Sequence, residues 1–200
     1  RHNVTWNTDP SWDNRETEGI LANTDFIAGA KVLSQKGLSL DIMQSFPQMP
    51  EIAVFAEAVP DLPIIVNHIG GVSRVGIYAG KDDEIIPVWK AGITALAACP
   101  NVTMKLGGMG MPRFGYDWHA REVPIGSEEL AEAMHPWMEH CIEQFGPDRC
   151  MFESNFPPDK VSFSYNVMYN AFKRLSKEYS ASDRAALFHD TAVRVYGIEA

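Results

Sequence analysis

Residues 149–158 read Arg-Cys-Met-Phe-Glu-Ser-Asn-Phe-Pro-Pro, an apolar run that ends abruptly in polar residues and prolines. The run Cys150–Phe152 follows a Gly-Pro-Asp turn signal, which predicts a short buried strand. The prolines stop it, because proline cannot donate to a central β-ladder. Alternate residues of a strand share a face, so Glu153 and Asn155 are expected to point the same way. Such strand ends carry the chemistry of α/β barrels, although polar residues there also cap ordinary turns.

The composition is typical of a globular domain with a sizeable core, because 46% of the 200 residues are hydrophobic and 22% are charged. The net charge of -9 argues against nucleic acid or an anionic membrane as the main partner, since both require clustered Lys and Arg. No apolar run reaches the roughly 20 residues of a membrane span. The 3 cysteines form no C-x-x-C motif, so we expect reduced thiols and a cytoplasmic protein.

Short apolar runs alternate with segments of helical pattern along the whole chain. Strands are predicted within residues 1–6, 38–43, 63–67, 101–106 and 150–152. Helices are predicted at residues 25–33, 50–59, 88–98, 127–145, 165–175 and 183–195, with caps at Ser127 and Ser182 and a kink or break at Pro136. This alternation predicts a parallel sheet with right-handed crossovers.

Two parallel folds fit this pattern. A doubly wound open sheet predicts a glycine-rich phosphate loop after its first strand, but residues 107–110 follow a late strand and lack the required spacing. A complete (β/α)8 barrel takes roughly 250 residues, and five strands cannot close one. We therefore predict an α/β fold of the TIM-barrel type. The chain would be the C-terminal part of a single barrel domain, from about the fourth to the eighth βα unit, with the first strands absent.

A reactive side chain lies at or near the end of each predicted strand. These residues are Arg1, Asp41, His68, Lys105, Glu153 and Asn155. Core packing alone would not place polar groups at the same end of strand after strand. At the mouth of a barrel they would form one site, which predicts an enzyme.

His68 is the sharpest single candidate, because it follows four apolar residues and precedes two glycines. Its imidazole could ligate a metal or donate a hydrogen bond to a substrate carbonyl, or it could be a buried structural histidine. Lys105 could hold a substrate carboxylate, or it could form a structural ion pair with Glu153. Arg113 and His119 fall in a long loop that would be either a substrate clamp or simply solvated.

Three segments together resemble the amidohydrolase-related family of TIM-barrel hydrolases, whose members include lactonases and decarboxylases acting on carboxylated ring-cleavage products. They are residues 66–71 (VNHIGG), 99–108 (CPNVTMKLGG) and 145–157 (FGPDRCMFESNFP), with Trp89 between the first two. The resemblance implies that His68 ends the sixth barrel strand and that Glu153 and Asn155 follow the eighth.

Two departures from the family pattern bear on the chemistry. Members carry a His-x-His pair on the first strand, which this chain lacks, as expected if its first strands are absent. They usually carry a water-activating Asp where Asn155 stands, and a Gly where Glu153 stands. A neutral amide cannot take a proton from water. We therefore predict that Glu153 supplies the displaced carboxylate and that Asn155 orients water or substrate.

The resemblance implies a hydrolase that cleaves a lactone or ester C–O bond of a small carboxylated substrate. Glu153, Asn155 and His68 would be catalytic, and Arg1, Lys105 and Asp41 would bind the substrate. A divalent metal such as zinc, held partly by His68, is implied for members that use one; others work without metal. The alternatives are a decarboxylase on the same scaffold and a non-catalytic ligand-binding barrel. Because an isolated half-barrel exposes two sheet edges, a homodimer is also predicted.

Overall fold

The computed structural model describes residues 2–6 and 15–199 of the chain, and Arg1 therefore lies outside the described residues. Five strands form one parallel sheet in the order β1-β2-β3-β4-β5. They are β1 (His2–Asn3), β2 (Leu40–Met43), β3 (Ile64–Val66), β4 (Val102–Leu106) and β5 (Cys150–Phe152). Strands that follow one another in both sequence and space are typical of a β/α barrel, whereas a doubly wound sheet reverses its order at a switch point. The predicted barrel-type α/β fold is confirmed.

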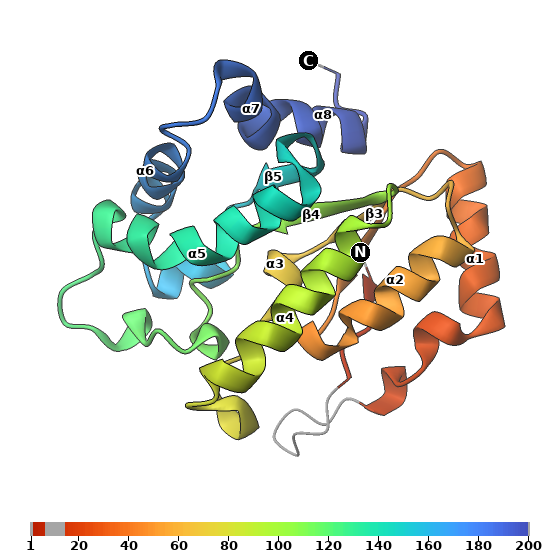
Figure 1. Ribbon diagram of the computed structural model, residues 1–200, viewed down its shortest axis with the longest axis horizontal. Coiled ribbons are helices and arrows are strands. Elements are labelled where there is room, and N and C mark those ends of the chain that lie inside the picture. Colours follow the sequence, from red (N-terminus) through yellow and green to blue (C-terminus); the bar gives the residue numbers. More distant parts are fainter. Residues whose placement is uncertain (1, 7–14, 200) are drawn as a thin grey trace.

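Helices connect the strands and cover one face of the sheet. They are α1 (Thr24–Gln35), α2 (Met49–Ala58), α4 (Asp82–Ala97), α5 (Ser127–Phe145), α6 (Tyr165–Leu175), α7 (Ala181–Ala185) and α8 (Thr191–Tyr196), with a π-helical turn at Ala186–Asp190. Figure 1 shows α2, α4 and α5 packed side by side in front of the strands. None of the helices in the described ranges combines the length and the apolar character that crossing a membrane requires.

Several predicted helix limits were wrong for local reasons. Helix α4 begins at Asp82, six residues early, because its acidic first turn suits the positive end of the helix dipole. Helix α5 continues through Pro136 to Phe145, so the proline does not divide it, and Gly126 rather than Ser127 is its N-cap. Ser180, not Ser182, caps α7, since its hydroxyl accepts the Asp183 amide.

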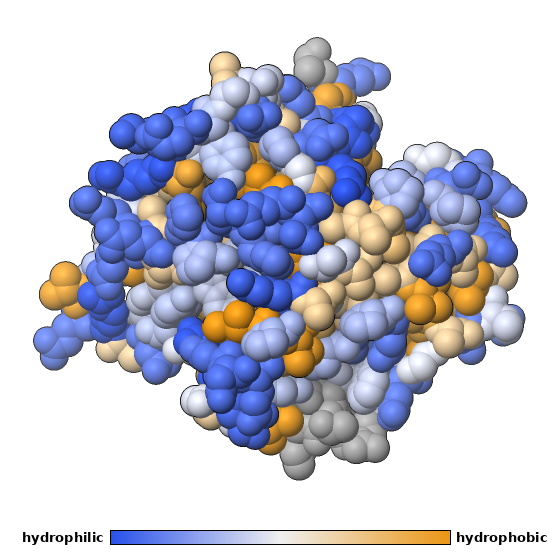
Figure 2. All heavy atoms as spheres, in the orientation of Figure 1, coloured by the Kyte–Doolittle hydropathy of each residue, from blue (hydrophilic) through white to orange (hydrophobic). Residues whose placement is uncertain are grey.

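The core lies between the sheet and the helices. One row of fully buried side chains crosses strands β2 to β5 on the helix side of the sheet. It consists of Ile42, Val66, Met104 and Cys150. Residues one position away point to the opposite face, because strand side chains alternate. On the molecular face that Figure 2 shows, hydrophilic side chains gather over α5 and α6, and apolar ones reach the surface over α2, where Val54 is 68% exposed.

Candidate active site

His68 and Glu153 meet at the carboxyl edge of the sheet. One carboxylate oxygen of Glu153, Oε1, lies 2.5 Å from His68 Nδ1 and also accepts the His68 backbone amide at 3.0 Å. The side chains are only 4% and 13% exposed. A carboxylate held this way fixes the orientation of the imidazole. The two residues predicted to be catalytic from separate strands are therefore in direct contact.

Two glycines make this contact possible. Strand β4 lies between the strands that carry His68 and Glu153, and Gly107 and Gly108 follow it directly. A Cβ atom at Gly107 would lie 2.4 Å from both Cγ and the backbone oxygen of Glu153, and one at Gly108 would lie 2.6 Å from His68 Cβ. The imidazole and the carboxylate thus reach one another across the end of β4 only because no side chain stands there.

We expect Gly107→Ala to destabilise the fold by about 2–3 kcal/mol, because the added methyl overlaps backbone atoms that cannot rotate away. The midpoint and slope of denaturant unfolding measure this. Gly29→Ala is the matched control: it lies within α1 with open space around its Cβ position, and it should gain roughly 0.5–1 kcal/mol of helix propensity. Equal midpoints for the two variants would show that the loop after β4 is looser than its contacts indicate.

The backbone at His68 is a left-handed turn. His68, Ile69, Gly70 and Gly71 (α3) have φ values of 55°, 45°, 80° and 70°. Non-glycine residues adopt this conformation at a cost of roughly 1–2 kcal/mol each, and such residues cluster at functional sites. The turn is held by Trp89, whose indole N–H donates to the Ile69 carbonyl at 2.7 Å. This strain turns the chain sharply at the strand end and places the imidazole over β4.

Asn155 does not lie where the strand pattern predicts. Strand β5 ends at Phe152, and Asn155 has a φ of 46°, so it shares no strand face with Glu153. Its amide Nδ2 donates instead to Asp159 Oδ1 at 2.7 Å. The expected shared face was wrong because the chain leaves the sheet after Glu153, whose backbone amide still donates to the Leu106 carbonyl of β4 at 3.1 Å. Its predicted role in orienting water or substrate stays a prediction.

Asp159 is a buried carboxylate that the sequence analysis missed. Its side chain is 1% exposed, and its Oδ2 accepts the Gly110 amide at 3.2 Å. Burial raises the pKa of Asp159 to about 6, against the lowering effect of hydrogen bonds from Asn155 and Gly110. The only local signal was its spacing of four residues from Asn155; Asp159 lies in the short 3-10 helix Pro158–Val161, and Asn155 lies before that helix.

Lys105 pairs with Asp41, so the suggested ion pair between Lys105 and Glu153 was wrong. The distance from Lys105 Nζ to Asp41 Oδ1 is 2.5 Å, and the Tyr196 hydroxyl lies 3.0 Å from the same oxygen. Asp41 and Lys105 share the sheet face opposite α2, α4 and α5, where Asp41 aligns with Ile65 and Thr103 and which Tyr196 at the end of α8 reaches. Burial lowers the pKa of Lys105, but the hydrogen bonds to Asp41 and Tyr196 outweigh it and raise the pKa overall. Substrate binding by Lys105 and Asp41 stays a prediction.

Lys105→Met is expected to destabilise the protein by about 2 kcal/mol, because the partly buried carboxylate of Asp41 loses its cationic partner and keeps the Tyr196 hydroxyl as a donor. Asp41→Asn should relieve that cost, so the double variant Lys105→Met/Asp41→Asn loses less than the sum of the singles. Denaturant unfolding of all four proteins measures the coupling. Strictly additive losses would show that the ion pair contributes nothing. Lys177→Met, at an exposed surface pair, controls for the substitution.

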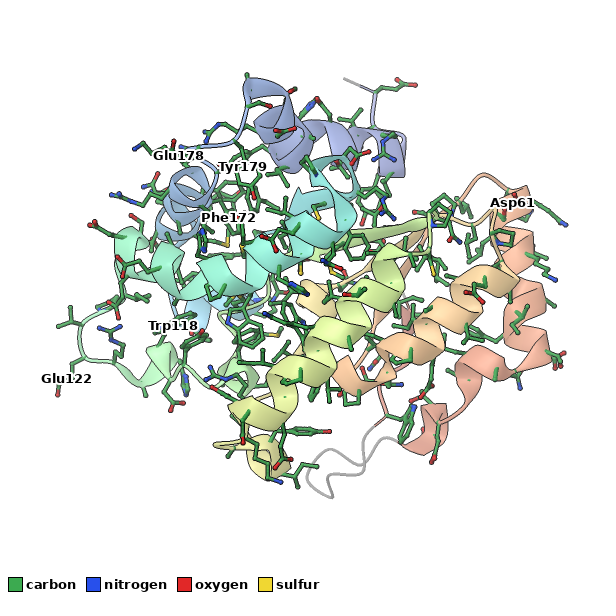
Figure 3. All side chains as sticks on the ribbon, viewed as in Figure 1. Asp61, Trp118, Glu122, Phe172, Glu178 and Tyr179 are labelled. Atoms are coloured by element: carbon green, nitrogen blue, oxygen red, sulfur yellow. The ribbon has the colours of Figure 1, made fainter. Side chains whose placement is uncertain are left out.

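A pocket of about 610 Å³ opens at the same edge of the sheet. It lies between Met43, the last residue of β2, and the loop that follows β4, and Met111, Arg113 and His119 of that loop line it. The loop is not simply solvated, because Tyr116 stacks on Trp118 with ring centroids 4.4 Å apart. Figure 3 shows Trp118 at the end of the molecule opposite Asp61, which precedes β3. The pocket combines apolar walls with the polar or charged side chains of Arg113, Asp117 and His119, the general make-up of a small-molecule site.

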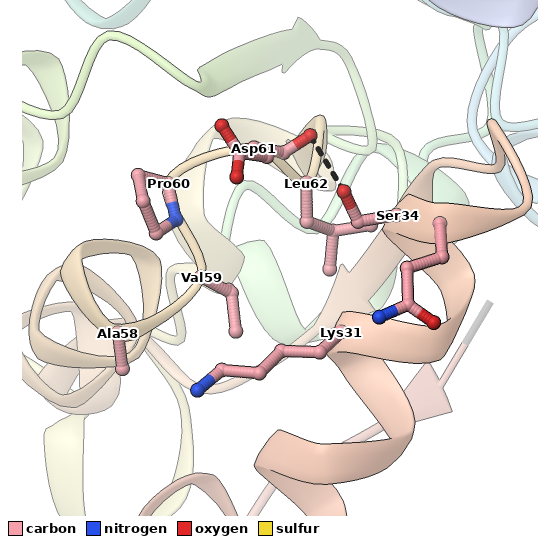
Figure 4. Close-up of a pocket in the computed structure, with 8 residues that line it drawn as sticks. Lys31, Ser34, Ala58, Val59, Pro60, Asp61 and Leu62 are labelled. Carbon is pink, nitrogen blue, oxygen red and sulfur yellow. Dashed lines mark hydrogen bonds between the residues drawn. The ribbon is translucent and has the colours of Figure 1, made fainter.

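A second cavity lies at the opposite end of the sheet. Lys31 and Ser34 of α1 line it together with residues 58–62, which lead into β3, and its volume is about 200 Å³. Figure 4 shows the Ser34 hydroxyl directed at the Asp61 carbonyl, to which it donates at 3.0 Å. His68, Glu153 and Asp159 line neither this cavity nor the pocket beside Met43, but this cavity lies at the amino ends of the strands and is therefore separate from the carboxyl-edge site.

Within the described ranges, no group of three His, Cys, Asp or Glu side chains is placed to hold a metal ion. His68 Nδ1 contacts Glu153, so a metal bound by this histidine would need Nε2. The donors present here therefore do not fit a metal centre by themselves, and no chemical step is assigned to one. The prediction that His68 ligates zinc stays a prediction.

The fold agrees with comparisons to known proteins. The chain matches the amidohydrolase family over residues 1–198, and it belongs to that family. It is 33% identical over 199 residues to the uncharacterized protein y4mH of Sinorhizobium fredii, covering 99% of this chain and 60% of that protein. It is 25% identical over 187 residues to L-fucono-1,5-lactonase of Burkholderia multivorans, covering 93% of this chain and 60% of the lactonase.

A similar solved structure is an amidohydrolase from Burkholderia multivorans with bound zinc. It superposes with a TM-score of 0.81 at 24% identity, covering all of this chain and 64% of that protein. At this identity the likeness shows the fold. The chain spans about 60% of the length of the curated relatives it matches best here.

Proposed function

We propose that the protein hydrolyses the C–O bond of a lactone or ester in a small carboxylated substrate, with His68 and Glu153 activating the attacking water. The observation that carries this proposal is the 2.5 Å contact between His68 Nδ1 and Glu153 Oε1 at the carboxyl edge of the sheet. The similarity to L-fucono-1,5-lactonase supports a lactone as the substrate class.

The reaction uses the imidazole as a general base. With its proton on Nδ1 and donated to Glu153, the ring takes a proton from water through Nε2, and the resulting hydroxide attacks the carbonyl carbon. Glu153 stabilises the imidazolium that forms. Collapse of the tetrahedral intermediate breaks the C–O bond, and His68 returns the proton to the departing oxygen. The product is a hydroxy acid, or an acid and an alcohol. Glu153 thus acts through His68, rather than directly on water.

The pocket supports a carboxylated substrate. Arg113 and His119 line it together with one acidic residue, Asp117, and a guanidinium matches the geometry of a carboxylate. Met43 and Met111 supply apolar contact for the ring or chain of the substrate. The predicted binding roles of Arg1, Lys105 and Asp41 belong to the same proposal, and Arg1 lies outside the described residues.

The test is turnover by the purified full-length protein on a panel of carboxylated and uncarboxylated lactones, followed by acid release with a pH indicator. We expect faster turnover of the carboxylated members. Release of carbon dioxide would identify a decarboxylase, and saturable binding without turnover would identify a ligand-binding barrel; either result would refute the proposal. Elemental analysis of the same preparation tests the predicted zinc.

A further inference from the structure

Three ionisable side chains pack against one short glycine-rich segment. Residues 107–110 read Gly-Gly-Met-Gly, and Glu153 lies against Gly107, His68 against Gly108 and Asp159 against Gly110. A Cβ atom at Gly110 would lie 2.8 Å from Asp159 Cβ. The segment 107–110 follows β4, whereas His68 follows β3 and Glu153 follows β5. It therefore brings the buried carboxylate of Asp159 to the same sheet edge as the His68–Glu153 contact.

The Asp159 carboxylate accepts hydrogen bonds from two loops, the one after β5 and the one after β4. Asn155 Nδ2 donates to its Oδ1, the Gly110 amide donates to its Oδ2, and its own backbone amide donates to the Asn155 carbonyl at 3.1 Å. The Ser162 hydroxyl donates to the Gly110 carbonyl at 2.5 Å, which further fixes Gly110 relative to Asp159. Two neutral donors are a small set for a carboxylate that is 1% exposed, so burial of its charge is incompletely compensated.

The charged groups that act on Asp159 are those of the proposed catalytic pair. His68 favours the ionised carboxylate and Glu153 opposes it. A buried charge that is kept at a cost beside reacting groups is characteristic of functional sites. Gly108, against which His68 lies, and Gly110, against which Asp159 lies, are two residues apart, so the two side chains are near enough to interact electrostatically.

We infer that Asp159 is a positioning residue whose negative charge stabilises the imidazolium of His68 during turnover, with Asn155 serving as its hydrogen-bond donor. This inference rests on the proposed function. It assigns Asn155 to holding a carboxylate, rather than to water or substrate. It also predicts that the charge impairs stability while improving catalysis, whereas a purely structural aspartate would improve stability.

The test compares Asp159→Asn, Asn155→Asp and the double variant with the parent at pH 8, in the full-length protein. Asp159→Asn keeps the hydrogen bonds, because the Asn155 amide can turn over and accept from the new amide. It should lower kcat about tenfold with KM within twofold, and raise the thermal unfolding midpoint. Asn155→Asp sets two carboxylates against each other and should lower both kcat and the midpoint. The double variant carries a single carboxylate again, so its kcat and its unfolding midpoint should return most of the way to those of the parent.

Each outcome decides the inference. An Asp159→Asn variant with parental kcat, or one that unfolds below the parent at pH 8, overturns it, as does a double variant no better than Asn155→Asp. If the parent protein turns over no lactone, the proposed function fails. The unfolding midpoints then still decide whether Asp159 is a buried charge held at a cost: a less stable Asp159→Asn rejects that, and a more stable one upholds it.

Discussion

Glu153→Gln is expected to lower kcat/KM for lactone hydrolysis by about 10²–10⁴-fold, because His68, the general base, loses the carboxylate that orients it and stabilises its protonated form during turnover. The amide keeps the size of the carboxylate and can still accept the His68 backbone N–H, now made at 3.0 Å. It removes the negative charge that stabilises the protonated imidazole, so the loss should fall on kcat. Steady-state kinetics on the best substrate of the lactone panel measures it.

Glu178→Gln is the matched control, because Glu178 is 89% exposed in a surface ion pair and should leave kcat/KM unchanged. Circular dichroism and the unfolding midpoint check that Glu153→Gln is folded. A folded Glu153→Gln variant with undiminished turnover would rule out Glu153 as the carboxylate of the reaction, and with it the proposed mechanism.

Asp159 should make stability fall as the pH rises. Burial raises the pKa of Asp159 from 3.8 to about 6, so in this interval the folded protein binds a proton that the unfolded chain has released. The stabilisation is complete below about pH 4 and is lost as the pH passes 6. A pKa shift of this size corresponds to a change of about 3 kcal/mol in the free energy of unfolding. The free energy of unfolding of Asp159→Asn should therefore gain about 3 kcal/mol relative to the parent between pH 4 and pH 7.

Urea unfolding of the parent and Asp159→Asn at half-unit pH intervals measures this difference. Subtracting the two curves removes the titration of all groups that the substitution leaves alone. Asp61→Asn, at an exposed carboxylate far from the site, controls for the change of residue type. A difference that stays constant from pH 4 to pH 7 would show that Asp159 titrates as an ordinary aspartate.

Local pattern was enough to predict the strands, because short apolar runs bounded by turn signals have few other ways to be buried. The strands observed at 40–43, 64–66, 102–106 and 150–152 all lie within the predicted ones. Helix starts were less predictable, as the early start of α4 shows. Its first turn is polar, so apolar periodicity does not reveal it, and only the acidic residues mark it.

Parallel connectivity alone placed His68 and Glu153 at one edge of the sheet, because every strand of such a sheet ends on the same side. Parallel connectivity does not determine which side chain each of these residues contacts. Glu153 contacts His68 across 85 residues of sequence, and Lys105 turns to Asp41 across 64. These pairings depend on whether a side chain is long enough to cross a neighbouring strand. They also depend on whether a glycine, having no side chain, leaves space for that contact. The burial of Asp159 depends on the contact between two loops, and no local pattern encodes that.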